Sequence, residues 1–487
     1  RDGGLASPSA VAANQPCAPG LDCGRPRVRA GESDGARDQN RMSKTGIRRA
    51  ELMRDASRWD AAFAAFEEEL RRFIQESASS AGGSGWHDSD EHEVRFRRLA
   101  LDLFSLQHSS VGPLSQLCRR RGISLDDIGD WRAIPALPTT AFKDYAISSL
   151  PSEARTRVFR SSGTTGHRPS RHFHSAGSLA VYEASLLPAF RAHLLGDAGQ
   201  GRGALTFLAL TPGPAEAPHS SLAHMFATVI EACGADDSAF VGAVGRDGAW
   251  RVDTAASSAL LLRCAQARRP VCFLGTAFAF VHLLDAMREE NRQCVLPPGS
   301  RALETGGYKG QSRIVSKPDL HRLIGATLGI ASTHIVSEYG MSELSSQAYD
   351  AFVPPSPPDR GSVGETGAGT ANLTASRFER RAVRGADEPG RFFFSVESST
   401  EPPSSRRRVF RFPPWARSMV VSPEDGAEVQ EGGTGLLRVI DLANVRSVLA
   451  VQTEDLAVRR GAGFELMGRA LMAEPRGCSL QAVAMAT

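Results

Sequence analysis

A glycine- and hydroxyl-rich segment near residue 160 has the residue types that hold phosphate groups. In chain order it reads Ser161, Ser162, Gly163, Thr164, Thr165 and Gly166. Small residues let backbone N–H groups approach an anion, and the hydroxyls add further donors. Arg168 and Arg171 follow and supply positive charge. No Gly-Lys-Ser/Thr ends the segment, which disfavours a P-loop NTPase. The segment predicts another kind of phosphate loop, with a plain surface loop as the alternative.

Four shorter motifs follow downstream in a fixed order. They are Glu304–Gly310 (ETGGYKG), Ser337–Glu343 (SEYGMSE), Thr453–Asp455 and Gly468–Arg469. Each is a weak signal by itself, because an isolated glutamate is usually a solvated charge, a tyrosine usually packs half-buried, and a Gly-Gly pair usually forms a turn. Their joint order after a phosphate loop is much more specific than any one of them.

This order of motifs resembles that of the adenylate-forming superfamily. The chain is most similar to the acyl-protein synthetase branch, the LuxE-type family of the luminescence fatty-acid reductase complex. Further stretches that resemble this branch are Leu137–Lys143, Pro413–Arg417, Asp441–Asn444 and Arg476–Leu480. The resemblance extends over about residues 95 to 482 and weakens between about 350 and 405.

The resemblance implies a role for each motif in holding ATP and Mg²⁺ while a carboxylate attacks the α-phosphate. The loop from Ser161 to Gly166 would close over the β- and γ-phosphates. Ser342, where the superfamily often has threonine, would donate its hydroxyl to the α-phosphate. Glu343 would hold Mg²⁺, a hard cation that prefers oxygen ligands.

The resemblance also implies an adenosine site. Tyr339 would pack on the adenine ring, with Gly340 in the same site. Gly306 and Gly307 would let the backbone approach the other face of the adenine. Asp455 would accept hydrogen bonds from the ribose hydroxyls.

The lysines and the end of the chain depart from the superfamily pattern. Arg469 would contact the ribose or cap a hinge, and only 18 residues follow it, where the superfamily has a longer domain with a catalytic lysine. We therefore expect that domain to be missing or vestigial. Of the 57 basic residues only four are lysines, and none follows Lys317. Lys309 lies inside a motif, so we predict that it neutralises charge at the α-phosphate instead.

Cys478 lies near the end of the chain, in the sequence Arg-Gly-Cys-Ser-Leu. In the acyl-protein synthetases a cysteine at such a position is acylated on the enzyme itself. A thiolate is a good nucleophile toward an acyl phosphate anhydride, and Arg476 would favour ionisation of the thiol. The alternative is a small apolar residue in a terminal segment. The eight cysteines contain no C-x-x-C pair, which argues against zinc or a disulfide framework and predicts a reducing cytoplasm.

Hydrophobic patterning predicts an α/β fold. Short apolar runs at 205–210, 271–274 and 333–336 alternate with helical patterns, as in a layered domain with largely parallel strands. Strand-like runs at 436–440 and 448–453 predict a β-rich end. The resemblance accordingly implies the large N-terminal domain of an adenylate-forming enzyme, with layered, mostly parallel sheets and helices and a small β-rich C-terminal segment.

Composition divides the chain into five expected regions. They are a disordered leader at 1–41, a helical region at 42–150, an α/β core at 151–353, a flexible insertion at 354–408 and a β-rich segment at 409–487 that contains the terminal cysteine. Inside the helical region, one amphipathic helix is predicted from the spacing of Phe63, Phe66, Leu70, Phe73 and Ile74.

Overall composition excludes several classes of protein and leaves three functions. A net charge of +3 predicts no nucleic-acid partner, and no apolar run approaches the length of a membrane span. The first hypothesis is an acyl-protein synthetase that activates a fatty acid and passes it to a protein thiol, with an acyl reductase or acyl carrier as partner. The alternatives are an acyl- or aryl-CoA ligase of the phenylacetate-activating type and a non-catalytic scaffold for a reductase.

Overall fold

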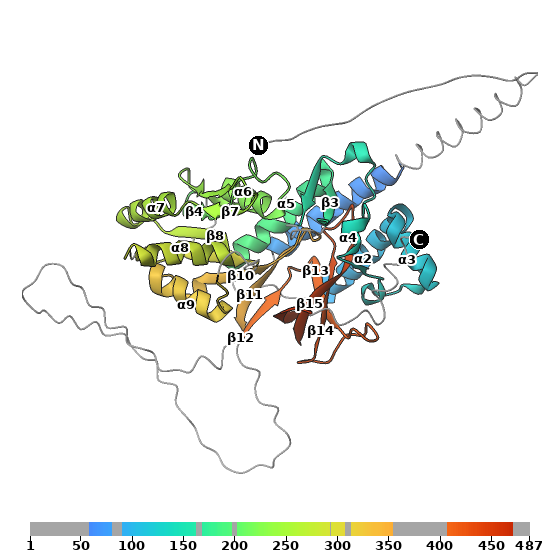
Figure 1. The fold of residues 1–487 in the computed structure, drawn as a ribbon. Helices are drawn as coiled ribbons and strands as arrows, with labels where there is room; N and C mark the ends of the chain where they lie inside the picture. The colour runs from blue at the N-terminus through green and yellow to red at the C-terminus, as the bar shows by residue number, and fades with distance from the viewer. Residues whose placement is uncertain are drawn as a thin grey trace, which may run out of the picture. The chain divides into compact units, whose positions relative to one another are not determined.

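The computed structural model describes residues 58–79, 90–161, 168–196, 202–292, 294–306, 313–353 and 407–470. The predicted leader, nearly all of the predicted insertion, and residues 471–487 lie outside this part of the chain. The described residues from Trp59 onward belong to one compact unit (Figure 1).

Twelve strands of the described residues form one large sheet. They are β1 (Leu137–Pro138), β4 (Thr206–Ala209), β5 (Ala239–Phe240), β8 (Val271–Thr276), β9 (Arg301–Thr305), β10 (Ile335–Tyr339), β11 (Ala348–Val353), β12 (Arg407–Arg411), β13 (Ala416–Val421), β14 (Thr434–Asp441), β15 (Ala450–Arg460) and β16 (Gly463–Arg469). The order across the sheet is β13-β14-β15-β16-β12-β11-β10-β9-β8-β4-β5, with β1 beside β15. Two hairpins, β2 (Arg157–Arg160) with β3 (Arg171–His174) and β6 (Gly242–Val244) with β7 (Trp250–Val252), stand apart from it.

The large sheet has a parallel half and an antiparallel half. Strands β5, β4, β8, β9 and β10 run parallel to one another. From β10 to β13 every neighbouring pair is antiparallel. Short connections favour antiparallel pairing, and only two residues join β15 to β16. The predicted α/β fold is confirmed, and its sheet is mixed.

Helices cover the parallel strands on both faces. The helices are residues 58–79, α2 (Asp90–Ser110), α3 (Gly112–Arg121), α4 (Ala141–Asp144), α5 (Ala176–Phe190), α6 (Ser221–Cys233), α7 (Thr254–Gln266), α8 (Ala277–Glu289) and α9 (Lys317–Leu328). Shorter helical turns are Leu125–Asp127, Trp131–Ala133, Ser152–Ala154, Arg191–Leu195 and Ser332–His334. Figure 1 shows α7, α8 and α9 gathered beside the parallel strands.

Alternate residues of each parallel strand join different hydrophobic clusters. Phe207 of β4 and Cys272 of β8 pack in the cluster that includes α5 and α6. Their neighbours Leu208 and Phe273 pack in a second cluster with α7, α8 and α9. Strands that are buried on both faces are apolar at most positions. This explains why the sequence shows continuous apolar runs there.

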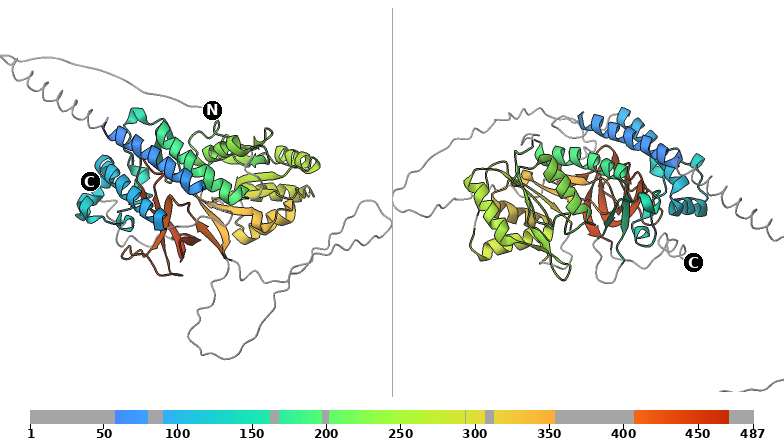
Figure 2. Two further views of the ribbon diagram at one scale, coloured as in Figure 1. Left: turned by 180° about the vertical axis from the view of Figure 1, so that it is seen from behind. Right: turned by 90° about the horizontal axis from the view of Figure 1, so that it is seen from above.

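The predicted N-terminal amphipathic helix is confirmed at residues 58–79. Its five predicted core residues are at most 5% exposed. The helix lies beside α5, as Figure 2 shows from behind and from above. Gln107 of α2 donates to the carbonyl of Asn444 at 2.8 Å, so the N-terminal helices and the β14–β15 turn share one core. Among the described residues no helix is both long and apolar enough to cross a membrane.

Candidate active site

Tyr339 ends β10 and contacts Asp455 of β15, which lies 116 residues later in the chain. The Tyr339 hydroxyl donates to Oδ2 of Asp455 at 2.7 Å. The tyrosine ring packs edge-on against three phenylalanines, Phe410, Phe412 and Phe464. Burial raises the pKa of Asp455, although the hydrogen bond from Tyr339 opposes this shift. The structure thus brings together the two residues that the sequence assigns to adenine and to ribose.

The turn that follows β10 carries Ser342 and Glu343, each 7% exposed. The Ser342 hydroxyl donates to Oε2 of Glu343 at 3.0 Å. The two backbone carbonyls of this pair also have side-chain donors. Nδ1 of His172 lies 3.0 Å from the Ser342 carbonyl, and Nδ2 of Asn444 donates to the Glu343 carbonyl at 3.0 Å. A Cβ at Gly340 would collide with the carboxylate of Glu338, so that side chain would have to move to admit a larger residue.

The described end of the predicted phosphate loop lies against the same turn. Ser161 Oγ accepts a hydrogen bond from the backbone N–H of Ser170 at 2.9 Å. The Ser170 hydroxyl lies 3.2 Å from the hydroxyl of Ser342. Ser162, Gly163, Thr164, Thr165 and Gly166 lie outside the described residues. Their predicted contact with phosphate remains a prediction.

The other predicted site residues lie at the edges of the described chain. Gly306 follows β9 and has φ +66°, a conformation that favours glycine. Arg469 ends β16; its side chain is 81% exposed, and its Nε lies 3.8 Å from Oδ1 of Asp455. Gly307, Lys309 and Cys478 lie outside the described residues, so their roles remain predictions.

A buried charge cluster at the ends of β9 and β10 was not predicted from the sequence. Glu304 is 2% exposed and accepts from Ser337 Oγ at 2.6 Å, and its carboxylate lies 3.1 Å from Nζ of Lys317. Burial alone raises the pKa of Glu304, but Lys317 and the hydrogen bonds outweigh it and lower the pKa to about 2. Glu338 forms no ion pair with a described residue. Burial raises its pKa to about 7, although a hydrogen bond from Thr305 and the charge of Lys317 act to lower it.

Two histidines of β3 are fully enclosed beside the turn. Burial lowers the pKa of His172 to about 4. Burial also lowers the pKa of His174 well below its ordinary value, helped by the neighbouring His172 and His224. Nε2 of His174 has no hydrogen-bond partner among the described residues. Residues 170, 172 and 174 share one side of the strand, because side chains alternate along β-strands. The sequence shows this only as alternating histidines after the loop.

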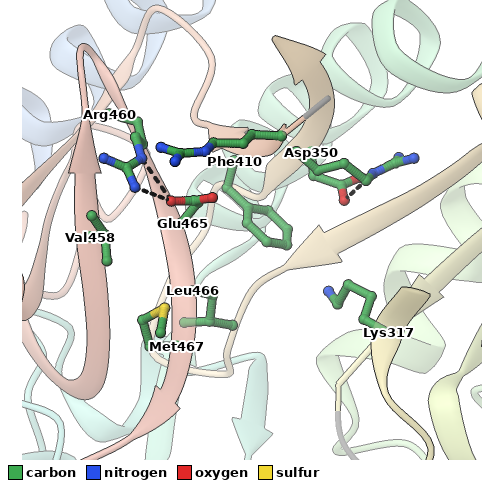
Figure 3. Close-up of a pocket in the computed structure, with 10 residues that line it drawn as sticks. Lys317, Asp350, Phe410, Val458, Arg460, Glu465, Leu466 and Met467 are labelled. Atoms are coloured by element: carbon green, nitrogen blue, oxygen red, sulfur yellow. Dashed lines mark hydrogen bonds and ion pairs between the residues drawn. The ribbon is translucent and has the colours of Figure 1, made fainter. Parts of the chain in front are cut away.

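A cavity of about 470 Å³ is lined by residues of β11, β12, β15, β16 and the start of α9 (Figure 3). Phe410 forms part of the cavity wall and its ring also contacts the ring of Tyr339. Its lining residues are Lys317, Asp350, Arg407, Arg408, Phe410, Val458, Arg460, Glu465, Leu466 and Met467. Arg408 pairs with Asp350 and Arg460 pairs with Glu465, both at 2.7 Å. These two arginines are therefore already neutralised by acids.

The described residues could bind Mg²⁺ only if phosphate oxygens of the substrate served as further ligands. They contain no group of three or more histidines, cysteines or acids that could hold a metal. Glu343 offers one nearly buried carboxylate, and no arginine or lysine among the described residues pairs with it. Magnesium commonly uses one or two carboxylates together with substrate phosphates and water. Glu343 fits that pattern.

No protein-family model matches the chain, and no curated protein matches it in sequence. Solved structures do match. A 2-hydroxyisobutyryl-CoA ligase in complex with 2-HIB-AMP and CoA superposes with a TM-score of 0.51 and 12% identity, covering 78% of this chain and 69% of that chain. The chain has the fold of an adenylate-forming ligase. At this identity the likeness establishes the fold and nothing finer.

Two further matches have lower scores. ATP-bound MatB from Rhodopseudomonas palustris matches with a TM-score of 0.36 and 16% identity over 67% of this chain and 50% of that one. The amide bond synthetase McbA from Marinactinospora thermotolerans matches with a TM-score of 0.36 and 15% identity over 65% and 49%. At these scores neither match adds an argument.

Proposed function

We propose that this chain is an ATP- and Mg²⁺-dependent ligase that activates a carboxylic acid as acyl-adenylate and passes the acyl group to a protein cysteine. The observation that carries the proposal is the convergence of separate motifs at the end of β10. Tyr339 meets Asp455 at 2.7 Å, and Ser342 meets Ser170 at 3.2 Å. Such convergence supports one site that handles the base, the ribose and the phosphates.

The reaction has two balanced steps. A carboxylate oxygen attacks the α-phosphorus of ATP, the bond to pyrophosphate breaks, and acyl-adenylate forms. A thiolate then attacks the acyl carbon, AMP leaves, and the thiol proton goes to solvent. Geometry and electrostatics carry most of the catalysis in phosphoryl and nucleotidyl transfer.

Each residue has a defined task in this proposal. The ring of Tyr339 supports the adenine, and Asp455 accepts from the ribose. Once ATP is bound, Ser342 redirects its one hydroxyl hydrogen from Glu343 to the α-phosphate, and Lys309 adds positive charge there. Glu343 holds Mg²⁺, which would neutralise phosphate charge when bound.

The first test is carboxylate-dependent exchange between ATP and labelled pyrophosphate, run over short to long fatty acids and aryl acids. We expect exchange with one class of acid and its loss in Glu343→Gln, which keeps the side-chain volume and removes the charge. An Asp253→Asn variant, altered at the exposed cap of α7, is the matched control and should retain exchange. ATP binding without exchange for any acid would instead favour a non-catalytic scaffold.

The acyl acceptor is tested separately. After incubation with ATP and the accepted acid, intact mass spectrometry should show one acyl group on the protein, released by hydroxylamine as expected for a thioester. Cys478→Ser should abolish the adduct and preserve pyrophosphate exchange, whereas Cys17→Ser should retain both. Formation of free acyl-CoA on addition of CoA, without an adduct on the protein, would favour the CoA ligase. A purified acyl reductase that removes the adduct would identify the partner class.

A further inference from the structure

Two segments that are 172 residues apart meet through buried serine hydroxyls. Ser170 is completely buried, and its Oγ lies 3.2 Å from Oγ of Ser342. Ser342 belongs to the turn with Glu343, and Ser170 immediately precedes β3. This buried contact favours one separation of the two segments, because breaking it would leave the Ser170 hydroxyl without its partner.

Ser170 also closes the base of the predicted phosphate loop. Its backbone N–H donates to Ser161 Oγ at 2.9 Å, and the Ser161 N–H donates to the Ser170 carbonyl at 3.3 Å. The same residue therefore contacts both the start of the loop and the turn after β10. Ser170 thereby connects the start of the loop to the turn.

The direction of the hydroxyl contact follows from counting hydrogens. A serine hydroxyl carries one hydrogen, and an ionised carboxylate can only accept. The Ser342 hydrogen is directed to Oε2 of Glu343 at 3.0 Å. The hydrogen between the two serines must then come from Ser170. The order of donation is Ser170 to Ser342 to Glu343.

Hydrogen bonds from two sides fix the backbone of the turn. The hydroxyl groups can therefore change only their own orientation. His172 Nδ1 contacts the Ser342 carbonyl at 3.0 Å and must donate, since a carbonyl only accepts. Asn444 donates to the Glu343 carbonyl at 3.0 Å from the other side. Ser170 and His172 reach the turn from the same face of their segment. At Ser342 the hydroxyl group remains free to rotate. Its oxygen accepts a hydrogen bond from Ser170 through one of its lone pairs.

We infer that Ser170 is a positioning residue for adenylation, which holds the Ser342 hydroxyl as a hydrogen-bond donor toward the side of the turn where Glu343 lies. The inference rests on the proposed function, because Ser170 acts there through Ser342. It deepens that function by tying the geometry of the phosphate loop to that of the metal-binding turn.

Two variants separate the donor from the side-chain volume. In Ser170→Ala we expect kcat for pyrophosphate exchange to fall about tenfold, while the KM for ATP stays within about twofold. Ser170→Cys fills the site with a somewhat larger thiol, which is a weak donor, so its kcat should fall similarly. Full activity in the cysteine variant would overturn the inference. If the alanine variant does not fold, the cysteine variant still carries the test.

A double-mutant cycle gives the readout that a purely structural role would not produce. In a Ser342→Ala background, Ser170→Ala should lower kcat by less than about twofold, because the hydroxyl it orients is gone. The same tenfold loss in both backgrounds would contradict the inference. Ser257→Ala, which removes a fully buried serine hydroxyl of α7, is the control and should leave kcat unchanged.

The inference and the proposed function fail in different ways. A wild-type protein without acid-dependent exchange would refute the function, whatever the serine variants do. A wild-type protein that exchanges, together with Ser170 variants of equal kcat, would refute the role of Ser170 alone. Melting temperatures within a few degrees of the wild type would show that the variants retain the fold.

Discussion

The hydroxyl and the ring of Tyr339 make separate contributions that can be measured separately. The hydroxyl donates to Asp455 at 2.7 Å, and the ring contacts Phe464 with centroids 5.4 Å apart. Tyr339→Phe removes only the hydroxyl, which leaves a mostly buried carboxylate without this donor. We expect the KM for ATP to rise about threefold to tenfold with little change in kcat, because ground-state and transition-state binding weaken together.

Steady-state kinetics with varied ATP concentration would check this prediction. Tyr339→Ala removes the ring as well and should cost about 3–5 kcal/mol of unfolding free energy, as for other buried aromatics. Equal melting temperatures for the phenylalanine and alanine variants would contradict the assignment of the ring to the core.

His172 makes the stability of the fold depend on pH. Burial lowers its pKa to about 4 from an ordinary value near 6.5, so the folded state favours the neutral ring. The stabilisation is complete above pH 6.5 and is lost as the pH falls from 6.5 through 4. The loss amounts to about 3 kcal/mol for a shift of this size.

His172→Asn keeps a donor for the Ser342 carbonyl but does not titrate. Denaturant unfolding between pH 7 and pH 4 should therefore give a shallower loss of stability in this variant, with the contribution of His174 remaining. Replacing the exposed His282 of α8 by asparagine is the control. An unchanged slope in His172→Asn would refute the role of His172 in this pH dependence.

At the scale of elements, the turn between β14 and β15 supports the turn after β10. The carboxylate of Asp441 accepts from the N–H groups of Ser345 and Ser346 at 2.9 and 2.8 Å and from the Ser346 hydroxyl at 2.7 Å. Asp441→Asn would replace one acceptor oxygen by an NH₂ group. That group would face the N–H and hydroxyl donors of Ser345 and Ser346. We expect a loss of about 3 kcal/mol in unfolding free energy and faster hydrogen exchange at 342–346.

Hydrogen–deuterium exchange by mass spectrometry would localise the effect. Exchange in peptides of α7 and α8 should stay at the wild-type rate, because the hydrogen bonds of Asp441 do not involve either helix. Uniformly faster exchange over the whole protein would show a general loss of stability and contradict a local supporting role.

The helix at 58–79 is attached to the same β14–β15 turn by a buried ion pair. Arg446 is 7% exposed and binds Oε1 of Glu67 and Oδ1 of Asp60, both at 2.8 Å. Arg446→Ala leaves the buried Glu67 without its cation, which should cost about 3–5 kcal/mol in denaturant unfolding. Arg446→Met combined with Glu67→Leu removes both charges and should be closer to the wild type. A double variant as unstable as Arg446→Ala would contradict this explanation.

At the scale of the whole molecule, the parallel half of the sheet was predictable from the sequence, because its strands are buried on both faces. Apolar runs marked β4 and β8, the shorter pair Ile335–Val336 marked the start of β10, and the helical spacing of five apolar residues marked the helix at 58–79. The pairing across the antiparallel half was not predictable. β12 and β16 meet after a separation of more than fifty residues, and local patterns do not encode such pairings.

The candidate site was predicted in part for a similar reason. Tyr339, Ser342, Glu343 and Asp455 belong to compact motifs, and the structure gathers them, while their roles remain predictions. The supporting residues Ser170, Asp441 and Asn444 act through partners 172, 95 and 101 residues away. A contact between buried polar side chains from distant segments leaves no periodic signal in either segment.

The most direct measurement of the central claim is the transfer of oxygen from the acid to AMP. The protein is incubated with ATP and an acid whose two carboxylate oxygens are ¹⁸O, and the released AMP is analysed by mass spectrometry. Attack of the carboxylate on the α-phosphorus predicts one ¹⁸O atom in AMP and none in pyrophosphate. Unlabelled AMP, or ¹⁸O in inorganic phosphate together with ADP, would contradict adenylation by this chain.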